Sequence, residues 1–72
     1  GNISGDRVRE LRLWARLSQS ALAAKMTTEG VIMEQDVISR IESGSRLVTD
    51  YELLALTRIF AVSADWLIGS GQ

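Results

Sequence analysis

The stretch from Leu17 to Gly44, LSQSALAAKMTTEGVIMEQDVISRIESG, decides the fold of this 72-residue chain. Its first part carries apolar residues at helical spacing after Ser18, a residue type whose hydroxyl accepts hydrogen bonds from the free amides of a following helix. Gly30 suits the left-handed conformation that commonly follows a helix. A second apolar pattern predicts a short helix from Glu34 to Glu42, before Gly44. The stretch therefore predicts two helices joined by a connection.

Helical patterns continue on both sides of this stretch. A first helix is predicted from Asp6 to Leu17. Thr49 and Glu52 match the capping box, in which the two side chains reciprocally satisfy free amides, and an apolar run follows directly. Ser63 is expected to cap a fifth, short helix over residues 64–68. Because no alternation of strand period competes with these patterns, the sequence predicts an all-α, compact five-helix bundle.

The length allows one small domain, with a core that is stable but thin. We expect this domain to span residues 6–69. Residues 1–5 are predicted to be a disordered start, and residues 70–72 a loose tail.

The composition argues against catalysis, cofactors and metals. The chain has no His, Cys or Pro, so disulfides and the usual ligands of zinc, haem and iron–sulfur clusters are absent. The usual general base and the strongest nucleophile are missing as well. Glu34 and Asp36 could be considered as a catalytic pair of carboxylates. They are two residues apart on a helix and point in different directions, which argues against an acid/base pair. The longest apolar runs have four residues, so no membrane span is expected.

The charge balance initially argues against nucleic-acid binding, because the net charge is −1. The charges are unevenly distributed, however. Residues 7–46 hold seven basic and five acidic residues, whereas residues 47–72 hold one basic and three acidic residues. The half that contains the stretch quoted above is thus weakly basic. We therefore expect weak non-specific, electrostatic binding to DNA, so that specific contacts would supply more of the binding free energy.

The predicted helix 34–42 combines a buried face with a polar face. Val37, Ile38 and Ile41 would face the core. The opposite face would carry Gln35, Asp36, Ser39 and Arg40. A helix with amide and guanidinium groups on its exposed face can read base edges in the DNA major groove. The residues alone favour a simpler interpretation, an ordinary amphipathic helix with a solvated polar face, because such helices are common.

Three segments in order resemble one family. They are residues 17–23 (LSQSALA), 38–44 (ISRIESG) and 61–67 (AVSADWL). Together they resemble the Xre/Cro family, the phage-repressor-like helix-turn-helix domains, over residues 7–69. The resemblance implies a lambda-repressor-like fold in which the second and third helices read DNA. It also implies a sequence-specific regulator that binds a double-stranded DNA operator, in the prokaryotic cytoplasm and associated with the nucleoid when bound.

The resemblance also implies roles for individual residues. The base-reading positions would be Gln35, Asp36, Ser39 and Arg40. The phosphate contacts would come from Gln19, Ser43, Ser45 and Arg46. A structural ion pair would join Arg12 and Glu42 and hold the third helix on the first. No cofactor or metal is implied.

The connection between Met26 and Ile38 is longer than in a tight helix-turn-helix, with eleven residues between them. It is expected to prolong the second helix by a turn and to add a loop. This lengthened helix 2–3 connection resembles a subgroup of Xre-type domains. Ile32 and Met33, which lie in it, are expected to be core residues.

A homodimer is expected, because one small domain presents few base contacts. The candidate surface consists of Leu47, Val48, Val62 and Trp66, although Trp66 fits a core position equally well. The alternative function is a protein-interaction module with the same fold, antitoxin-like or a scaffold. The net charge and the carboxylates of Glu34 and Asp36, which phosphates would repel, favour this alternative.

Overall fold

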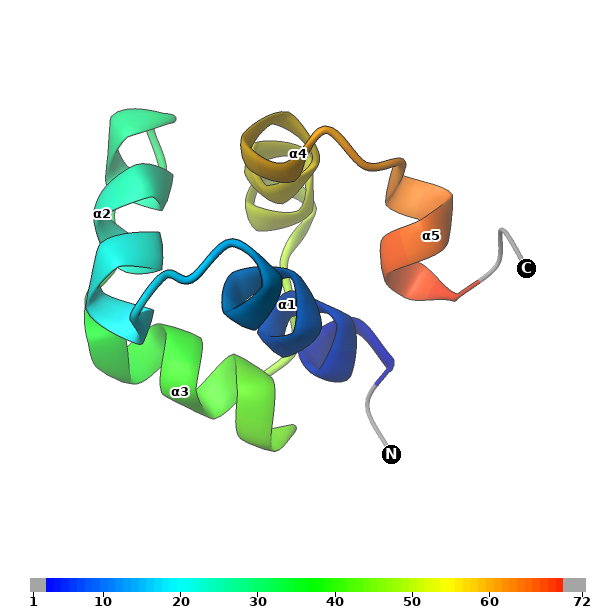
Figure 1. Cartoon of the computed structure of the whole chain (residues 1–72), viewed down its shortest axis with the longest axis horizontal. Helices are drawn as coiled ribbons and strands as arrows, with labels where there is room; N and C mark the ends of the chain where they lie inside the picture. The colour runs from blue at the N-terminus through cyan, green and yellow to red at the C-terminus, as the bar shows by residue number, and fades with distance from the viewer. Residues whose placement is uncertain (1–2, 70–72) are drawn as a thin grey trace.

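The computed structural model describes residues 3–69, and over them the chain forms five helices and no strand. The helices are α1 (Ile3–Trp14), α2 (Gln19–Thr28), α3 (Gln35–Ser43), α4 (Asp50–Phe60) and α5 (Ala64–Ile68) (Figure 1). The predicted all-α, five-helix fold is confirmed.

The first helix lies at the centre of the arrangement. Figure 1 shows α2 and α3 on one side of α1 and α5 on the other. The contacts between helices agree with this view, because α3 packs against both α1 and α2, while α5 packs against α1 and α4. As a result α3 has one face on the scaffold and one face directed outward.

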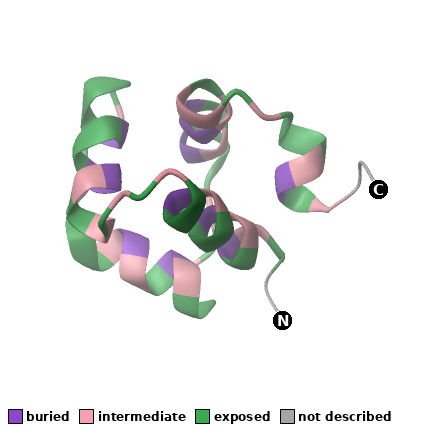
Figure 2. Ribbon diagram, in the orientation of Figure 1, coloured by how far each residue is buried: buried purple, intermediate pink, exposed green. Residues whose placement is uncertain are grey.

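The core is formed by buried apolar residues from all five helices and from the loop before α3; buried residues, apolar or not, are purple in Figure 2. Its members are Val8, Leu22, Ala23, Met26, Met33, Ile38, Ile41, Ala55, Leu56 and Leu67. Met33 is buried as predicted, but the prediction for Ile32 is wrong, since 87% of Ile32 is exposed. The two residues lie in a loop, where successive side chains follow no helical period, so one points inward and its neighbour outward.

Three predicted helix starts are confirmed. The Ser18 hydroxyl accepts a hydrogen bond from the Ala21 amide at 3.0 Å, and the Ser63 hydroxyl caps α5 in the same way. Thr49 and Glu52 form the complete capping box of α4. Each of these caps satisfies amides that the first turn of a helix leaves free.

The bounds of α1 differ from the prediction. The helix begins at Ile3, so residues 3–5 are helical and Gly5 is buried, where a disordered start was expected. It ends at Trp14 instead of Leu17, because Arg16 adopts a left-handed conformation (φ 59°). The Leu17 amide then donates to the Arg12 carbonyl, which closes the helix end. Residues 1–2 of the predicted start and the tail 70–72 lie outside the described residues.

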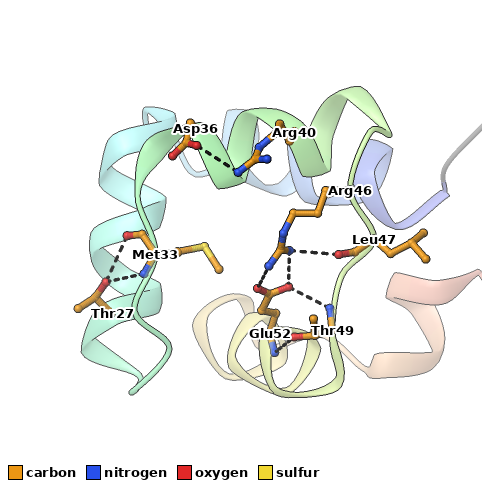
Figure 3. Close-up of polar contacts among 8 residues, drawn as sticks. All are labelled: Thr27, Met33, Asp36, Arg40, Arg46, Leu47, Thr49 and Glu52. Carbon is orange, nitrogen blue, oxygen red and sulfur yellow. Dashed lines mark hydrogen bonds and ion pairs between the residues drawn. The ribbon is translucent and has the colours of Figure 1, made fainter.

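The connection between α2 and α3 is a loop over residues 29–34. Gly30 has the expected left-handed conformation, with φ 91°. The Thr27 hydroxyl lies near both backbone groups of Met33, at 3.4 Å from its nitrogen and 3.5 Å from its oxygen (Figure 3). The third helix begins at Gln35 and ends at Ser43, one residue later at each end than predicted.

Candidate nucleic-acid interface

The outward face of α3 is polar along its whole length. Ile38 and Ile41 are buried and fix the inner face on the core. Residues three and four positions apart share a helix face, so the remaining side chains form an outward stripe. This stripe consists of Gln35, Asp36, Ser39, Arg40 and Ser43, all exposed except the half-buried Ser39. The structure thus brings all four predicted base-reading residues to one surface.

A buried ion pair joins α3 to α1. The Arg12 guanidinium donates from Nε to Glu42 Oε2 at 2.6 Å and from Nη2 to Glu42 Oε1 at 2.9 Å. Its third donor, Nη1, bonds to the Leu17 carbonyl at 2.9 Å. Only 11% of the Arg12 side chain and 5% of the Glu42 side chain are exposed. The hydrogen bond to Glu42 raises the pKa of Arg12 despite its burial, so the guanidinium remains charged.

Two glutamines extend this pair toward the surface. Gln19, the first residue of α2, donates from Nε2 to Glu42 Oε1 at 3.2 Å. Its Oε1 accepts a hydrogen bond from Gln35 Nε2 at 2.6 Å. A continuous polar chain therefore runs from Arg12 through Glu42 and Gln19 to Gln35, and it restrains the side chain that begins the outward stripe.

Gln35 keeps unused hydrogen-bonding capacity. Its side chain makes no bond among residues 3–69 other than the one to Gln19. One N–H and the oxygen of its amide are therefore available. This is the donor and acceptor pattern that pairs with the edge of adenine in the major groove.

Asp36 and Arg40 form an exposed ion pair one helical turn apart. Arg40 Nη2 lies 3.2 Å from Asp36 Oδ2, and 55% and 66% of the two side chains are exposed (Figure 3). Such a pair stabilises a helix by only about 0.3–0.5 kcal/mol. The remaining N–H groups of the Arg40 guanidinium bond to no residue between 3 and 69, so it can turn toward another acceptor at little cost.

The turn after α3 is held by short-range bonds. Gly44 adopts a left-handed conformation, with φ 83°. The hydroxyls of Ser43 and Ser45 both bond to the Arg40 carbonyl and lie 3.1 Å from each other. Both serines are exposed, so their hydroxyls remain accessible at the end of the outward stripe.

Arg46 is directed back to the scaffold. Its guanidinium donates to both carboxylate oxygens of Glu52, at 2.8 and 2.7 Å, and to the Leu47 carbonyl (Figure 3). The hydrogen bond from Arg46 is the main reason why the pKa of Glu52 lies below its usual value. Arg46 thus forms a structural pair, which competes with the phosphate contact predicted for it.

A family model described as a helix-turn-helix domain matches residues 5–67. The chain belongs to the helix-turn-helix domain family. No curated protein and no solved structure matches the chain. Membership indicates a DNA-binding regulatory domain, in agreement with the polar outward face of α3.

The structure of this helix-turn-helix domain adds a second role for Glu52 and one residue, Arg9, that the sequence did not single out. Glu52 is a buried ion-pair partner as well as a capping residue, and only the nearby Arg46 could have indicated this. Arg9, on α1, lines a shallow hollow with Gln19, Ser39, Glu42 and Ser43. No regular spacing links Arg9 to α3, so the sequence offered no signal for their proximity.

The predicted dimer surface is divided in the structure. Leu47 is 78% exposed, whereas Val48, Val62 and Trp66 are half-buried and pack against the core. The Arg7 guanidinium lies 4.6 Å from the centre of the Trp66 ring. Trp66 therefore packs partly inside the domain. Of the four predicted surface residues, only Leu47 exposes most of its side chain to solvent.

Two further findings concern metals and membranes. Over the described residues, no group of three or more acidic side chains could hold a metal ion. None of the helices between residues 3 and 69 is long and apolar enough to cross a bilayer.

Proposed function

We propose that this helix-turn-helix domain is the sequence-specific, double-stranded-DNA-binding part of a prokaryotic or phage transcriptional regulator of the Xre/Cro type. It acts in the cytoplasm by occupying an operator, with α3 in the major groove and with no chemistry of its own. The observation that carries the proposal is the polar chain from Arg12 to Gln35. It holds an exposed amide at the start of α3 on a buried ion pair, and a fixed geometry of this kind is what bidentate base recognition needs.

Base reading is assigned to the outward stripe. Gln35 suits adenine through its free N–H and oxygen, and Arg40 suits guanine through its unoccupied guanidinium donors. Asp36 can accept from the amino group of cytosine, and Ser39 adds a hydroxyl. Gln19, Ser43 and Ser45 border this stripe, where they would contact phosphates and fix the register of α3.

A homodimer suits this function, since two-fold repressors place their recognition helices about 34–36 Å apart, one turn of DNA. Three exposed apolar side chains support a surface for the second copy. Ile3, Leu47 and Ile68 are 51%, 78% and 50% exposed, and they line one hollow beside the end of α3. A partner docked there would lie beside the C-terminal end of α3, where Ser43 is the one residue of the outward stripe that lines the hollow.

Two observations favour the second candidate, a protein-interaction module. Ile32 is 87% exposed in the loop directly before α3, and a large exposed apolar side chain is typical of protein contacts. The pairing of Arg40 with Asp36 also reduces the positive charge of the outward face. An antitoxin-like or scaffold domain would use both features.

Fluorescence-polarisation titration separates the two candidates. The duplexes are DNA flanking the protein's own coding region and a scrambled control, each at two salt concentrations. We expect binding that weakens steeply as salt rises, because phosphate contacts release counterions. Arg40→Ala should reduce discrimination between the duplexes by about 1–3 kcal/mol.

The matched control is Arg58→Ala. Arg58 is an exposed arginine on α4 that lines a different hollow, with Lys25 and Glu29. Its removal should leave discrimination unchanged. Failure of the parent to bind either duplex at low salt, as a verified dimer, would favour the protein-interaction module.

A further inference from the structure

The shallow hollow beside α3 lies where three helices meet. Its lining comes from α1 through Arg9, from α2 through Gln19 and from α3 through Ser39, Glu42 and Ser43. Glu42 is neutralised by Arg12 and accepts a further hydrogen bond from Gln19. The groups left to meet a ligand are therefore hydrogen-bond donors and one cation.

Arg9 differs from the other arginines around α3. Arg12, Arg40 and Arg46 each have a carboxylate partner, in Glu42, Asp36 and Glu52 respectively. Within residues 3–69, Arg9 forms no ion pair and its side chain is exposed. It supplies an uncompensated positive charge at the edge of the outward stripe.

Ser39 has an unused hydroxyl at the same place. Ser39 is half-buried, and its hydroxyl makes no hydrogen bond to the other residues between 3 and 69. Ser43, one helical turn further along α3, adds a second hydroxyl. Its one hydrogen bonds to the Arg40 carbonyl, and it can rotate toward a ligand because Ser45 also donates to that carbonyl. A guanidinium and two hydroxyls that converge in this way match the acceptor oxygens of a phosphate.

The position of the hollow matches that of a DNA backbone. The major groove is about 12 Å wide, and an α-helix with its side chains is about 10–12 Å across. A helix lying in the groove therefore has sugar–phosphate walls along its flanks. Arg9 comes from α1 and reaches α3 from the side, where such a wall would pass, instead of from the outward stripe that faces the bases.

We infer that this hollow seats one phosphate of the DNA backbone, with Arg9 supplying the charge and Ser39 and Ser43 the hydrogen bonds. The inference rests on the proposed DNA-binding function. It gives Arg9 the backbone contact that Arg46, held by Glu52, is poorly placed to make. It also moves Ser39, at the edge of the outward stripe, from base reading to the DNA backbone.

The test measures how affinity depends on salt for a short duplex of arbitrary sequence, between about 50 and 200 mM KCl. Arg9→Gln should weaken binding to all sequences alike. It should also make the log–log salt slope shallower by about 0.9 per subunit, the value for one lost phosphate contact. Arg9→Lys should keep the slope of the parent. Circular dichroism and melting temperature check that each variant remains folded.

Two controls distinguish a phosphate-binding site from a general effect of charge. Ser39→Ala should lower affinity about two- to tenfold and leave the slope unchanged, because a hydroxyl carries no charge. Arg58→Gln removes an equal charge from α4 and should leave the slope near that of the parent.

Each outcome is decisive. The phosphate site would be refuted if Arg9→Gln kept the salt slope of the parent. It would also be refuted if Arg9→Gln and Arg58→Gln lowered the slope equally. In both cases the proposed DNA-binding function stands. If the parent protein bound no duplex, the proposed function would be refuted, and the phosphate site with it.

Discussion

The inner and outer sides of α3 use the same types of charged residue in opposite ways. On the inner side Glu42 is almost fully buried and bonded to Arg12 through both oxygens. On the outer side Asp36 and Arg40 are more than half exposed and share one contact of 3.2 Å. Burial makes each member of the first pair depend on the other, because neither charge can be left unpaired away from water. Exposure makes the second pair dispensable, so its members are available for a ligand.

The pair between Arg46 and Glu52 lies between these extremes. Glu52 is buried, with 6% of its side chain exposed, whereas 32% of the Arg46 side chain is exposed. The carboxylate depends on its partner, but the guanidinium can turn toward water. The three pairs therefore form a series, and their substitutions should differ in the same order.

Glu42→Ala should have the largest effect. It leaves the buried Arg12 guanidinium without its carboxylate, which costs on the order of 3–5 kcal/mol of unfolding free energy. It also removes an acceptor from Gln19, so the restraint on Gln35 and DNA binding should weaken together. Urea unfolding and polarisation titration measure the two losses.

The double variant Arg12→Met with Glu42→Leu serves as the control for this prediction. Replacing a buried pair by apolar residues of similar volume is often neutral for stability. We expect it to recover most of the unfolding free energy while DNA binding stays weak. A binding loss in Glu42→Ala with an unchanged melting temperature would show that the pair does not anchor α3.

Glu52→Gln should have an intermediate effect. Glutamine keeps the acceptor that the capping box needs, so the substitution removes mainly the charge facing Arg46. A hydrogen bond to a charged group contributes about 1.5–3 kcal/mol, and Arg46 recovers part of its loss by turning to water. The unfolding free energy at neutral pH should therefore fall by about 1.5 kcal/mol or less.

The stabilisation by Glu52 should depend on pH, and the pKa of Glu52 predicts in which direction. The pKa of Glu52 is lower in the folded protein than its ordinary value, so the folded state binds a proton less readily than the unfolded state. Its stabilisation is complete above the unfolded pKa of about 4.3 and is lost as pH falls through the folded pKa. Melting curves from pH 7 to pH 2.5 should converge for parent and Glu52→Gln at the acidic end. A constant difference across this range would contradict the assignment.

Local signals explain what the sequence predicted well. Ser18, Thr49 and Ser63 each precede a helix, and a cap depends only on residues within one turn of it. The end of α1 carried no such signal, since Arg16 adopts a left-handed conformation that usually falls to glycine or asparagine. The exposure of Ile32 was equally hidden, because side chains of a loop follow no period.

The candidate site was predictable only where family resemblance supplied long-range information. The proximity of Arg12 and Glu42, thirty residues apart, follows from that resemblance and not from any spacing. The pair between Arg46 and Glu52 depends on the direction of the chain after Gly44, which no local pattern specifies. The approach of Arg9 to α3 is likewise set by how the helices pack.

Asp36→Asn should have the smallest effect on stability and a visible effect on binding. Loss of an exposed pair one turn apart changes the unfolding free energy by about 0.5 kcal/mol or less. The substitution also removes a negative charge from the face that approaches phosphates and releases Arg40. Affinity for a scrambled duplex should therefore rise at low salt, and the gain should shrink as salt screens the charge. Polarisation titration at two salt concentrations measures this, with Asp50→Asn as the control, since Asp50 is an exposed first-turn carboxylate of α4. If both variants gain equally, net charge and not the outer side of α3 governs the contact with DNA.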